Sequence, residues 1–331
     1  MNKPYIAIIG PALAKANNGN WQTARRWQQF LQTDHRVACM IDWQADRDEA
    51  PALMVALHAR RSAPSIAAFA GAFPRRPLVL VLTGTDLYRD IAVDPAAQRS
   101  LSLATRLVIL QPAGREVLPA ALQAKTQVIF QSAARLAPHV ASPAARYFNV
   151  IMIGHLRAEK NPQTFMQAAA LVTAPDVRLL HVGAALEPAL GRLAMQTQQD
   201  FNRYAWLGSL PQPQTRQRLK RSALMVIASH MEGGANVIIE AVTSGVPVLA
   251  SGISGNRGML GEDYAGYFAV GDSAALARLI DRAATDPRFH ALLRKQCALR
   301  APLFAPARER AAVVELIDNC LSNSLQPTGT T

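Results

Sequence analysis

The chain has 331 residues, of which 50% are hydrophobic and 18% are charged, and its formal net charge is +12. This composition is typical of a globular protein rather than a disordered one, and the length suggests two domains of roughly 150 residues each. No apolar run approaches the roughly 20 residues of a membrane span, and the scattered basic pairs accompany no nucleic-acid motif, so we expect neither membrane nor nucleic-acid partners.

The start of the chain and its cysteines bear on where the protein works. The segment MNKPYIAIIGPAL enters an apolar strand at once, without the layout of a signal peptide, so we expect a cytoplasmic protein. Cys39, Cys297 and Cys320 are widely spaced and form no CxxC pair. This pattern predicts reduced thiols rather than a disulfide framework or a zinc site.

Short apolar runs alternate with amphipathic segments, which is the pattern of βα units around a parallel sheet. In the first half, strands are expected at 5–9, 36–41, 53–58, 78–83, 106–110 and 127–130, with a helix at 21–32. A second series is expected at 148–154, 177–183, 203–208, 223–229 and 246–251, and the chain then closes with helices. The pattern therefore predicts an α/β protein with two doubly wound, Rossmann-like domains.

The polar segment AARLAPHVASPAAR separates the two series and places the domain boundary near Arg146. We expect an N-terminal domain at 1–146 and a C-terminal domain at 147–303, facing each other across a cleft with the carboxyl ends of their strands. A helix at 304–322 is expected to pack back toward the N-terminal domain, and 323–331 to form a flexible tail.

Two loops after strands could approach an anion. In the first, Asn18-Gly19-Asn20 precedes a helix, so Asn20 is expected to be its N-cap and Gly19 to let a phosphate come close, although an ordinary turn is the alternative. In the second, Arg157 and Lys160 precede a helix that Asn161-Pro162 would open. The pair is either a diphosphate clamp or two solvated cations.

The stretch MEGGANVIIEAVTSG places Glu232 in a loop and Glu240 about two turns further on, within a helix that Gly245 would end. This separation suits two hydroxyl-bearing parts of one extended ligand, with the amides of Gly233 and Gly234 approaching its charged middle. The alternative is that Glu232 is exposed and Glu240 only solvates a helix.

The spacing of these two glutamates, with GHLRAEKN upstream, resembles the retaining glycosyltransferases of the GT-B fold, family 4, which use nucleotide-sugar donors. The likeness covers almost the whole chain, including NNGN and TGTD. More closely, LHARRSA, LTGTDLYRDI, MEGGANVIIEAV, SGNRGMLGEDYAGYF and VGDSAAL resemble the selenosugar synthases of selenoneine biosynthesis. Those enzymes join selenophosphate to the sugar of a UDP-sugar, typically UDP-N-acetylglucosamine, and form a carbon–selenium bond.

The resemblance implies roles for the donor-side residues. Arg157 and Lys160 would stabilise the departing UDP diphosphate, Glu232 would hold donor-sugar hydroxyls, and Glu240 would hold the ribose. Further donor contacts are implied for Gly19, Gly208, Gly233, Gly234 and Asn236, with the uracil near Leu207–Ser209. No tightly bound cofactor and no metal are implied.

On the acceptor side, related transferases commonly carry HGTD or HGSD where this chain has Thr83-Gly84-Thr85-Asp86, so an imidazole is missing. An alcohol acceptor benefits from such a base, whereas selenophosphate already carries its charge and needs a cationic pocket. The residues expected to form this pocket are Lys15, His58, Arg60, Arg61, Thr85 and Asp86, aided by Arg89.

The function expected from the resemblance is a selenosugar synthase that releases UDP and phosphate. An enzyme supplying selenophosphate upstream, and one joining the selenosugar to a histidine derivative downstream, would be its pathway partners. Three alternatives stay open: a conventional transferase acting on an alcohol or lipid, a sugar-nucleotide epimerase, and a non-enzymatic RNA-binding protein.

Overall fold

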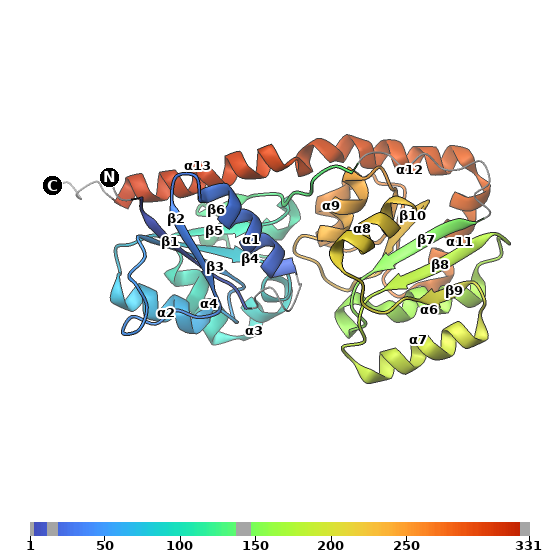
Figure 1. Ribbon diagram of the computed structural model, residues 1–331, viewed down its shortest axis with the longest axis horizontal. Coiled ribbons are helices and arrows are strands. Elements are labelled where there is room, and N and C mark those ends of the chain that lie inside the picture. The colour runs from blue at the N-terminus through green and yellow to red at the C-terminus, as the bar shows by residue number, and fades with distance from the viewer. Residues whose placement is uncertain (1–2, 12–18, 137–146, 325–331) are drawn as a thin grey trace. The chain divides into compact units, whose positions relative to one another are not determined.

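The computed structural model describes residues 3–11, 19–136 and 147–324 (Figure 1). The chain forms two compact units, Met1–Gln131 together with Pro306–Thr331, and Ser132–Ala305. The boundary expected near Arg146 lies outside the described residues.

The first unit is built on a parallel sheet of six strands in the order β2-β1-β3-β4-β5-β6. The strands are β1 (Tyr5–Ile9), β2 (Arg36–Met40), β3 (Leu53–Leu57), β4 (Leu78–Leu82), β5 (Arg106–Ile109) and β6 (Thr126–Val128). The helices are α1 (Gly19–Leu31), α2 (Ala63–Ala72), α3 (Ile91–Val93), α4 (Pro95–Leu103), α5 (Ala120–Gln123) and α13 (Pro306–Ser324). A π-helical turn, η2 (Asp86–Asp90), and a short 3-10 helix, η3 (Pro112–Arg115), complete it.

Every residue of β3 and β4 is buried, which shows that both faces of this sheet are covered. One cluster joins alternate strand residues to Trp27 of α1 and Ile317 of α13, and the other joins the remaining residues to Phe69 of α2 and Leu101 of α4. Strands buried on both faces read as continuous apolar runs, which is why the sequence pattern located them.

Helix α13 is fastened to α1 by a buried carboxylate. Glu309 is 2% exposed and accepts hydrogen bonds from Arg26 Nε at 2.9 Å, from Arg26 Nη2 at 3.1 Å and from Trp27 Nε1 at 3.0 Å. The last helix of the chain is therefore part of the first unit's core.

The second unit holds another parallel sheet of six strands, in the order β12-β11-β10-β7-β8-β9. The strands are β7 (Phe148–Ile153), β8 (Val177–Val182), β9 (Tyr204–Trp206), β10 (Leu224–Ile227), β11 (Val248–Ser251) and β12 (Tyr267–Phe268). The helices are α6 (Pro162–Leu171), α7 (Pro188–Asp200), α8 (Gln212–Lys220), α9 (Asn236–Thr243), α10 (Ser254–Leu260), α11 (Ser273–Thr285) and α12 (Pro287–Arg300), with 3-10 helices η4 (Ala158–Lys160) and η5 (Ala301–Phe304).

Each unit thus has the doubly wound α/β architecture expected from the sequence. Two details differ. Strand β12 was not expected, because two residues are too few to show an alternating pattern. Helix α1 begins at Gly19, so Asn20 lies inside its first turn and the prediction that Asn20 is the N-cap is wrong.

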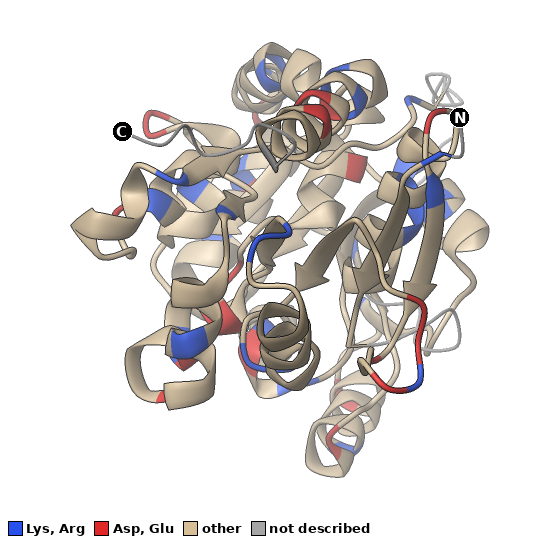
Figure 2. Cartoon of the chain, turned by 90° about the vertical axis from the view of Figure 1, so that its left-hand side faces the viewer, with Lys and Arg blue, Asp and Glu red and all other residues tan. Residues whose placement is uncertain are grey.

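Figure 2 shows Lys and Arg on strands, helices and loops, interspersed with Asp and Glu. The charge of +12 is therefore spread along the chain rather than confined to one element.

Candidate active site

The loop after β7 carries the predicted cationic pair. Asn161 adopts a left-handed conformation (φ 46°, ψ 55°) and α6 begins at Pro162, as the sequence predicted. The backbone of this loop is fixed from two sides: Glu159 O accepts from His230 N at 2.9 Å, and Ala158 N donates to Glu187 Oε1 at 2.7 Å. The β7 and β10 loops are therefore joined directly at the carboxyl edge of the sheet.

Lys160 and Glu232 meet at this junction. Lys160 Nζ donates to Glu232 Oε1 at 2.5 Å, and the two side chains are only 19% and 10% exposed. Ser229 Oγ donates to the same carboxylate oxygen at 2.6 Å. Glu232 is thus a buried, ion-paired carboxylate rather than an exposed loop residue, and two predicted catalytic residues 72 positions apart are in contact.

Arg157 lies in a more open environment. Its side chain is 38% exposed, and Arg157 Nε is 4.0 Å from Glu159 Oε2. The Arg157 guanidinium therefore keeps N–H groups available to a ligand at the protein surface, whereas Lys160 of the same loop is largely buried.

The start of α9 presents backbone N–H groups. The residue before it, Ala235, offers no side-chain cap, and no described residue accepts a hydrogen bond from the amides of Gly233, Gly234 or Asn236. Free amides at the positive end of a helix dipole favour an anion. These amides follow Glu232 directly, so an anion bound there would lie close to the Lys160–Glu232 pair.

Glu240 faces α8. Its Oε1 accepts from Gln212 Nε2 at 3.3 Å and lies 4.0 Å from Arg216 Nε, and its side chain is 14% exposed. The sequence did not indicate Gln212 or Arg216, because they precede Glu240 by more than 20 positions and belong to no recognisable motif.

Gly208 follows β9 and has φ 66°, a left-handed conformation that favours glycine. Its carbonyl accepts from Gly183 N at 2.8 Å, and a Cβ at this position would meet nothing within 4 Å. Open space therefore borders the backbone at the point where the sequence placed the uracil.

In the first unit, Asp86 ties the ends of β3 and β4 together. Its carboxylate is fully buried and accepts from Thr83 N at 2.9 Å, Gly84 N at 2.8 Å and Ala59 N at 2.9 Å. These bonds give Asp86 a structural role, and its contact with an acceptor stays a prediction.

His58 follows β3 with φ 76°, a strained conformation for a residue with a side chain, and is 2% exposed. Its Nδ1 accepts from Arg61 N at 3.3 Å, so its Nε2 is the protonated nitrogen that donates to Thr85 Oγ1 at 3.0 Å. Burial lowers the pKa of His58, with the nearby arginines Arg61 and Arg60 adding to the effect and Asp86 opposing it. The imidazole is therefore neutral near pH 7 and orients the Thr85 hydroxyl through this hydrogen bond.

Asp90, at the end of η2, was missed by the sequence reasoning. Its carboxylate lies between two of the predicted acceptor-side cations, accepting from Arg60 Nε and from Arg89 Nε, both at 3.0 Å. Burial by itself raises the pKa of Asp90, but the bond from Arg89 and the charge of Arg60 outweigh it and the net shift is downward. Asp90 is therefore an ionised partner that orients both arginines.

Two other predicted residues lie at the surface. Arg61 is exposed, and Gly19 is exposed in the first turn of α1, where its carbonyl accepts from Thr23 Oγ1 at 2.9 Å. Lys15 lies outside the described residues.

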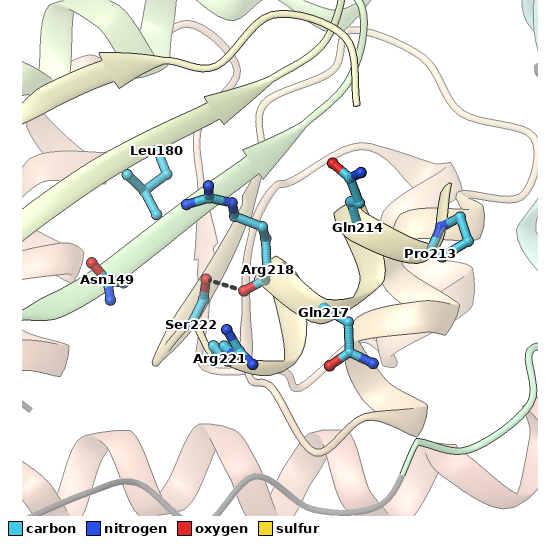
Figure 3. A pocket seen from close by; sticks show the side chains of 8 residues that line it. All are labelled: Asn149, Leu180, Pro213, Gln214, Gln217, Arg218, Arg221 and Ser222. Carbon is cyan, nitrogen blue, oxygen red and sulfur yellow. Dashed lines mark hydrogen bonds between the residues drawn. The ribbon is translucent and has the colours of Figure 1, made fainter. Parts of the chain in front are cut away.

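A pocket of about 530 Å³ opens elsewhere in the second unit (Figure 3). Its lining residues are Asn149, Leu180, Pro213, Gln214, Gln217, Arg218, Arg221 and Ser222. It contains none of the predicted site residues, and Asn149 lies near the amino end of β7, the end of the strand away from the loop that carries Arg157 and Lys160. We therefore assign the site from the contacts at the carboxyl edge rather than from this pocket.

Among the described residues, no group of three or more His, Cys, Asp or Glu side chains is placed to hold a metal ion. In the same part of the chain, no helix combines the length and the apolar character needed to cross a membrane.

Comparisons with known proteins agree with this architecture. Residues 141–301 match the family model of glycosyl transferases group 1. A search of curated proteins gave no match.

Solved structures show the same fold at low sequence identity. HepE of Anabaena in complex with UDP-glucose has a TM-score of 0.74 and 17% identity, covering 96% of this chain and 100% of that chain. Sucrose-phosphate synthase from Thermosynechococcus elongatus has a TM-score of 0.77 and 15% identity, covering 97% and 100%. Trehalose 6-phosphate synthase from Burkholderia multivorans has a TM-score of 0.66 and 13% identity, covering 84% and 73%. The chain therefore has the GT-B fold of two Rossmann-like domains, as the sequence predicted, and its residues 141–301 are similar to the group 1 glycosyl transferases.

Proposed function

We propose that the protein is a glycosyltransferase that takes a UDP-sugar donor and transfers the sugar to selenophosphate, forming a carbon–selenium bond. The observation that carries the donor half is the Lys160–Glu232 pair, held at 2.5 Å beside the free amides of Gly233 and Gly234. The HepE structures, which contain UDP and UDP-glucose, support a donor of this class.

The second unit offers complementary groups for each part of such a donor. The exposed guanidinium of Arg157, the Lys160 ammonium and the α9 amides would neutralise the diphosphate. Glu232 would accept hydrogen bonds from sugar hydroxyls and Glu240 from the ribose. The open backbone at Gly208 would border the uracil.

The first unit favours an acceptor that arrives with its own negative charge. At the carboxyl ends of β3 and β4, among the described residues, Asp86 is occupied by backbone N–H groups and Asp90 by two arginines. His58 uses one nitrogen to accept and the other to donate. A neutral alcohol would need a base to remove its proton, and none of these three groups is free to act as one.

An anionic acceptor fits the same surroundings. Because His58 donates to Thr85 Oγ1, the Thr85 hydroxyl proton is directed away from the imidazole and can be donated to an oxyanion. Arg60 and Arg61 add positive charge nearby. Selenophosphate combines phosphate-like oxygens for these donors with a polarisable selenium nucleophile.

The reaction balances without a cofactor. Selenium attacks the anomeric carbon while the bond from that carbon to the diphosphate oxygen breaks, and the electron pair leaves with UDP. Water then adds to phosphorus, the Se–P bond breaks, and phosphate departs, leaving a selenium anion on the sugar. The pathway would need a selenophosphate-producing enzyme upstream and an enzyme that alkylates or conjugates the selenosugar downstream.

Mass spectrometry of an anaerobic mixture of protein, selenophosphate and UDP-N-acetylglucosamine tests the proposal, with a control lacking selenophosphate. A selenium isotope pattern on a hexosamine mass, together with released UDP, is expected. UDP release with an alcohol acceptor but no selenium product would identify a conventional transferase instead. A product that keeps its phosphate would contradict the hydrolysis step.

A further inference from the structure

The two carboxylate oxygens of Glu232 are in different environments. Oε1 accepts from Lys160 Nζ at 2.5 Å and from Ser229 Oγ at 2.6 Å. No described residue donates a hydrogen bond to Oε2. The protein therefore uses one oxygen to hold the side chain and leaves the other for a ligand.

Ser229 is itself held by buried polar groups from the next strand. Ser251 Oγ, at the end of β11, donates to Ser229 O at 2.6 Å. Asn256 Nδ2, from α10, donates to Ser251 Oγ at 3.1 Å and to Ser251 O at 2.9 Å. Ser229, Ser251 and Asn256 are all fully buried.

These bonds form one directed series across three adjacent strand ends, β11, β10 and β7. Asn256 donates to Ser251, Ser251 donates to the backbone of Ser229, and the Ser229 hydroxyl donates to Glu232. Each of these bonds is buried, where the surroundings screen a hydrogen bond little.

The backbone of Glu232 packs closely against α10, the helix that carries Asn256. A Cβ on Gly255 of α10 would lie 1.9 Å from Glu232 O, so only glycine lets the helix approach this closely. The carboxylate of Glu232 is therefore held through Ser229, and its peptide packs directly against α10.

We infer that Ser229 is a positioning residue that holds Glu232 with Oε2 toward the donor sugar, and that Ser251 and Asn256 hold Ser229 in place. This inference rests on the proposed function and adds to it the group that controls recognition of the sugar half of the donor. Ser229 acts through Glu232 and does not itself touch the substrate.

Calorimetric titration of Ser229→Ala with UDP and with UDP-N-acetylglucosamine separates the two halves of the donor. Loss of one hydrogen bond to a charged group is expected to weaken UDP-N-acetylglucosamine binding about tenfold or more, while UDP binding changes less than about twofold. Ser229→Thr keeps the hydroxyl and is expected to restore most of the loss. Ser222→Ala, which removes another buried serine hydroxyl that donates to Arg218 O at 2.9 Å, is the matched control and should alter neither affinity.

A double-mutant cycle distinguishes positioning from general stability. In a Glu232→Ala background, Ser229→Ala should add much less than its single effect, because either change alone removes the same interaction. Additive effects, or a Ser229→Ala protein that binds the donor like Ser222→Ala, would overturn the inference while leaving the proposed function intact. Failure of the wild-type protein to bind UDP or any UDP-sugar would instead refute the proposed function, and the inference with it.

Discussion

Arg157 and Lys160 are three positions apart, yet their side chains differ in exposure and in ion pairing. Lys160 is buried against Glu232, whereas the Arg157 side chain is 38% exposed and its Nε lies 4.0 Å from Glu159 Oε2. An exposed cation with so loose a partner contributes little to stability. Arg157 is therefore expected to serve binding and catalysis rather than stability.

Replacing Arg157 with Ala tests this difference. We expect turnover with a UDP-sugar to fall about 100-fold or more, because the hydrogen-bond donors of the Arg157 guanidinium no longer stabilise the departing diphosphate. The unfolding temperature should stay unchanged. UDP release and thermal unfolding are the two measurements. Arg278→Ala removes an exposed arginine of α11 and should leave both unchanged. Near-normal turnover of Arg157→Ala would remove this residue from the mechanism.

His181 makes stability of the second unit depend on pH. It is fully buried on β8, and its Nδ1 is 2.9 Å from the Tyr204 hydroxyl. Burial lowers its pKa to about 4 from the ordinary 6.5, against a smaller upward effect of the Gly154 backbone. Since the unfolded chain takes up a proton below pH 6.5 and the folded chain does so only near pH 4, stability present above pH 6.5 is lost as the pH falls between these values.

The loss amounts to at most about 3 kcal/mol, and it should be much smaller in His181→Gln, which keeps a polar group for Tyr204 but does not titrate. Urea unfolding at pH 7 and pH 4.5, followed by far-ultraviolet circular dichroism, measures the difference. An identical pH dependence in both proteins would show that other groups control acid sensitivity.

At the scale of elements, the approach of α10 to the β10 loop depends on Gly255. A methyl group there would collide with the Glu232 carbonyl oxygen, which belongs to the backbone and cannot rotate away. Gly71 in α2 is a matched contrast, because a Cβ there would meet nothing within 4 Å.

Gly255→Ala is therefore expected to destabilise the protein and to abolish most donor binding, as the Glu232 loop must move to admit the methyl group. Gly71→Ala should instead raise stability by about 0.5–1 kcal/mol, since alanine is the better helix former. Chemical unfolding of the two variants measures their stability, and UDP-sugar titration measures their donor affinity. Normal donor binding by Gly255→Ala would show that the Glu232 loop can move without disturbing the site.

At the scale of the whole molecule, the chain leaves the first unit after Gln131 and returns to it at Pro306. The return is secured by Val313, Leu316 and Ile317 in the core and by Glu309 against Arg26 and Trp27. The stability of the first unit therefore depends on residues at the opposite end of the sequence.

Glu309→Ala removes the carboxylate that accepts from the partly buried Arg26 guanidinium and from the Trp27 indole N–H, and we expect it to cost the first unit about 1–3 kcal/mol. Hydrogen–deuterium exchange should show faster exchange in β1, β3 and α1, with the second unit's peptides unchanged. Glu315→Ala, an exposed position on the same helix, is the control. Uniformly faster exchange in both units would contradict a local role for Glu309.

The sequence by itself determined most strands, the α/β class and the start of α6 at Pro162, because these follow from local apolar runs and from backbone restrictions of single residues. It also singled out Lys160, from a loop between a strand and a helix, and Glu232, from its spacing to Glu240, while the family resemblance supplied their expected roles. The two-residue strand β12 and the first turn of α1 were beyond it, since neither carries enough residues to show a period.

Only the tertiary structure decided which side chains meet. The contacts of Lys160 with Glu232, of Asp90 with Arg60 and of Arg26 with Glu309 join residues 72, 30 and 283 positions apart. The hydrogen bonds that link Glu232 to Ser229, Ser251 and Asn256 arise in the same way, because parallel strands distant in sequence end at one edge of a sheet. Local patterns select the elements, whereas packing of those elements decides which polar groups are buried together and so which oxygen of Glu232 remains for a ligand.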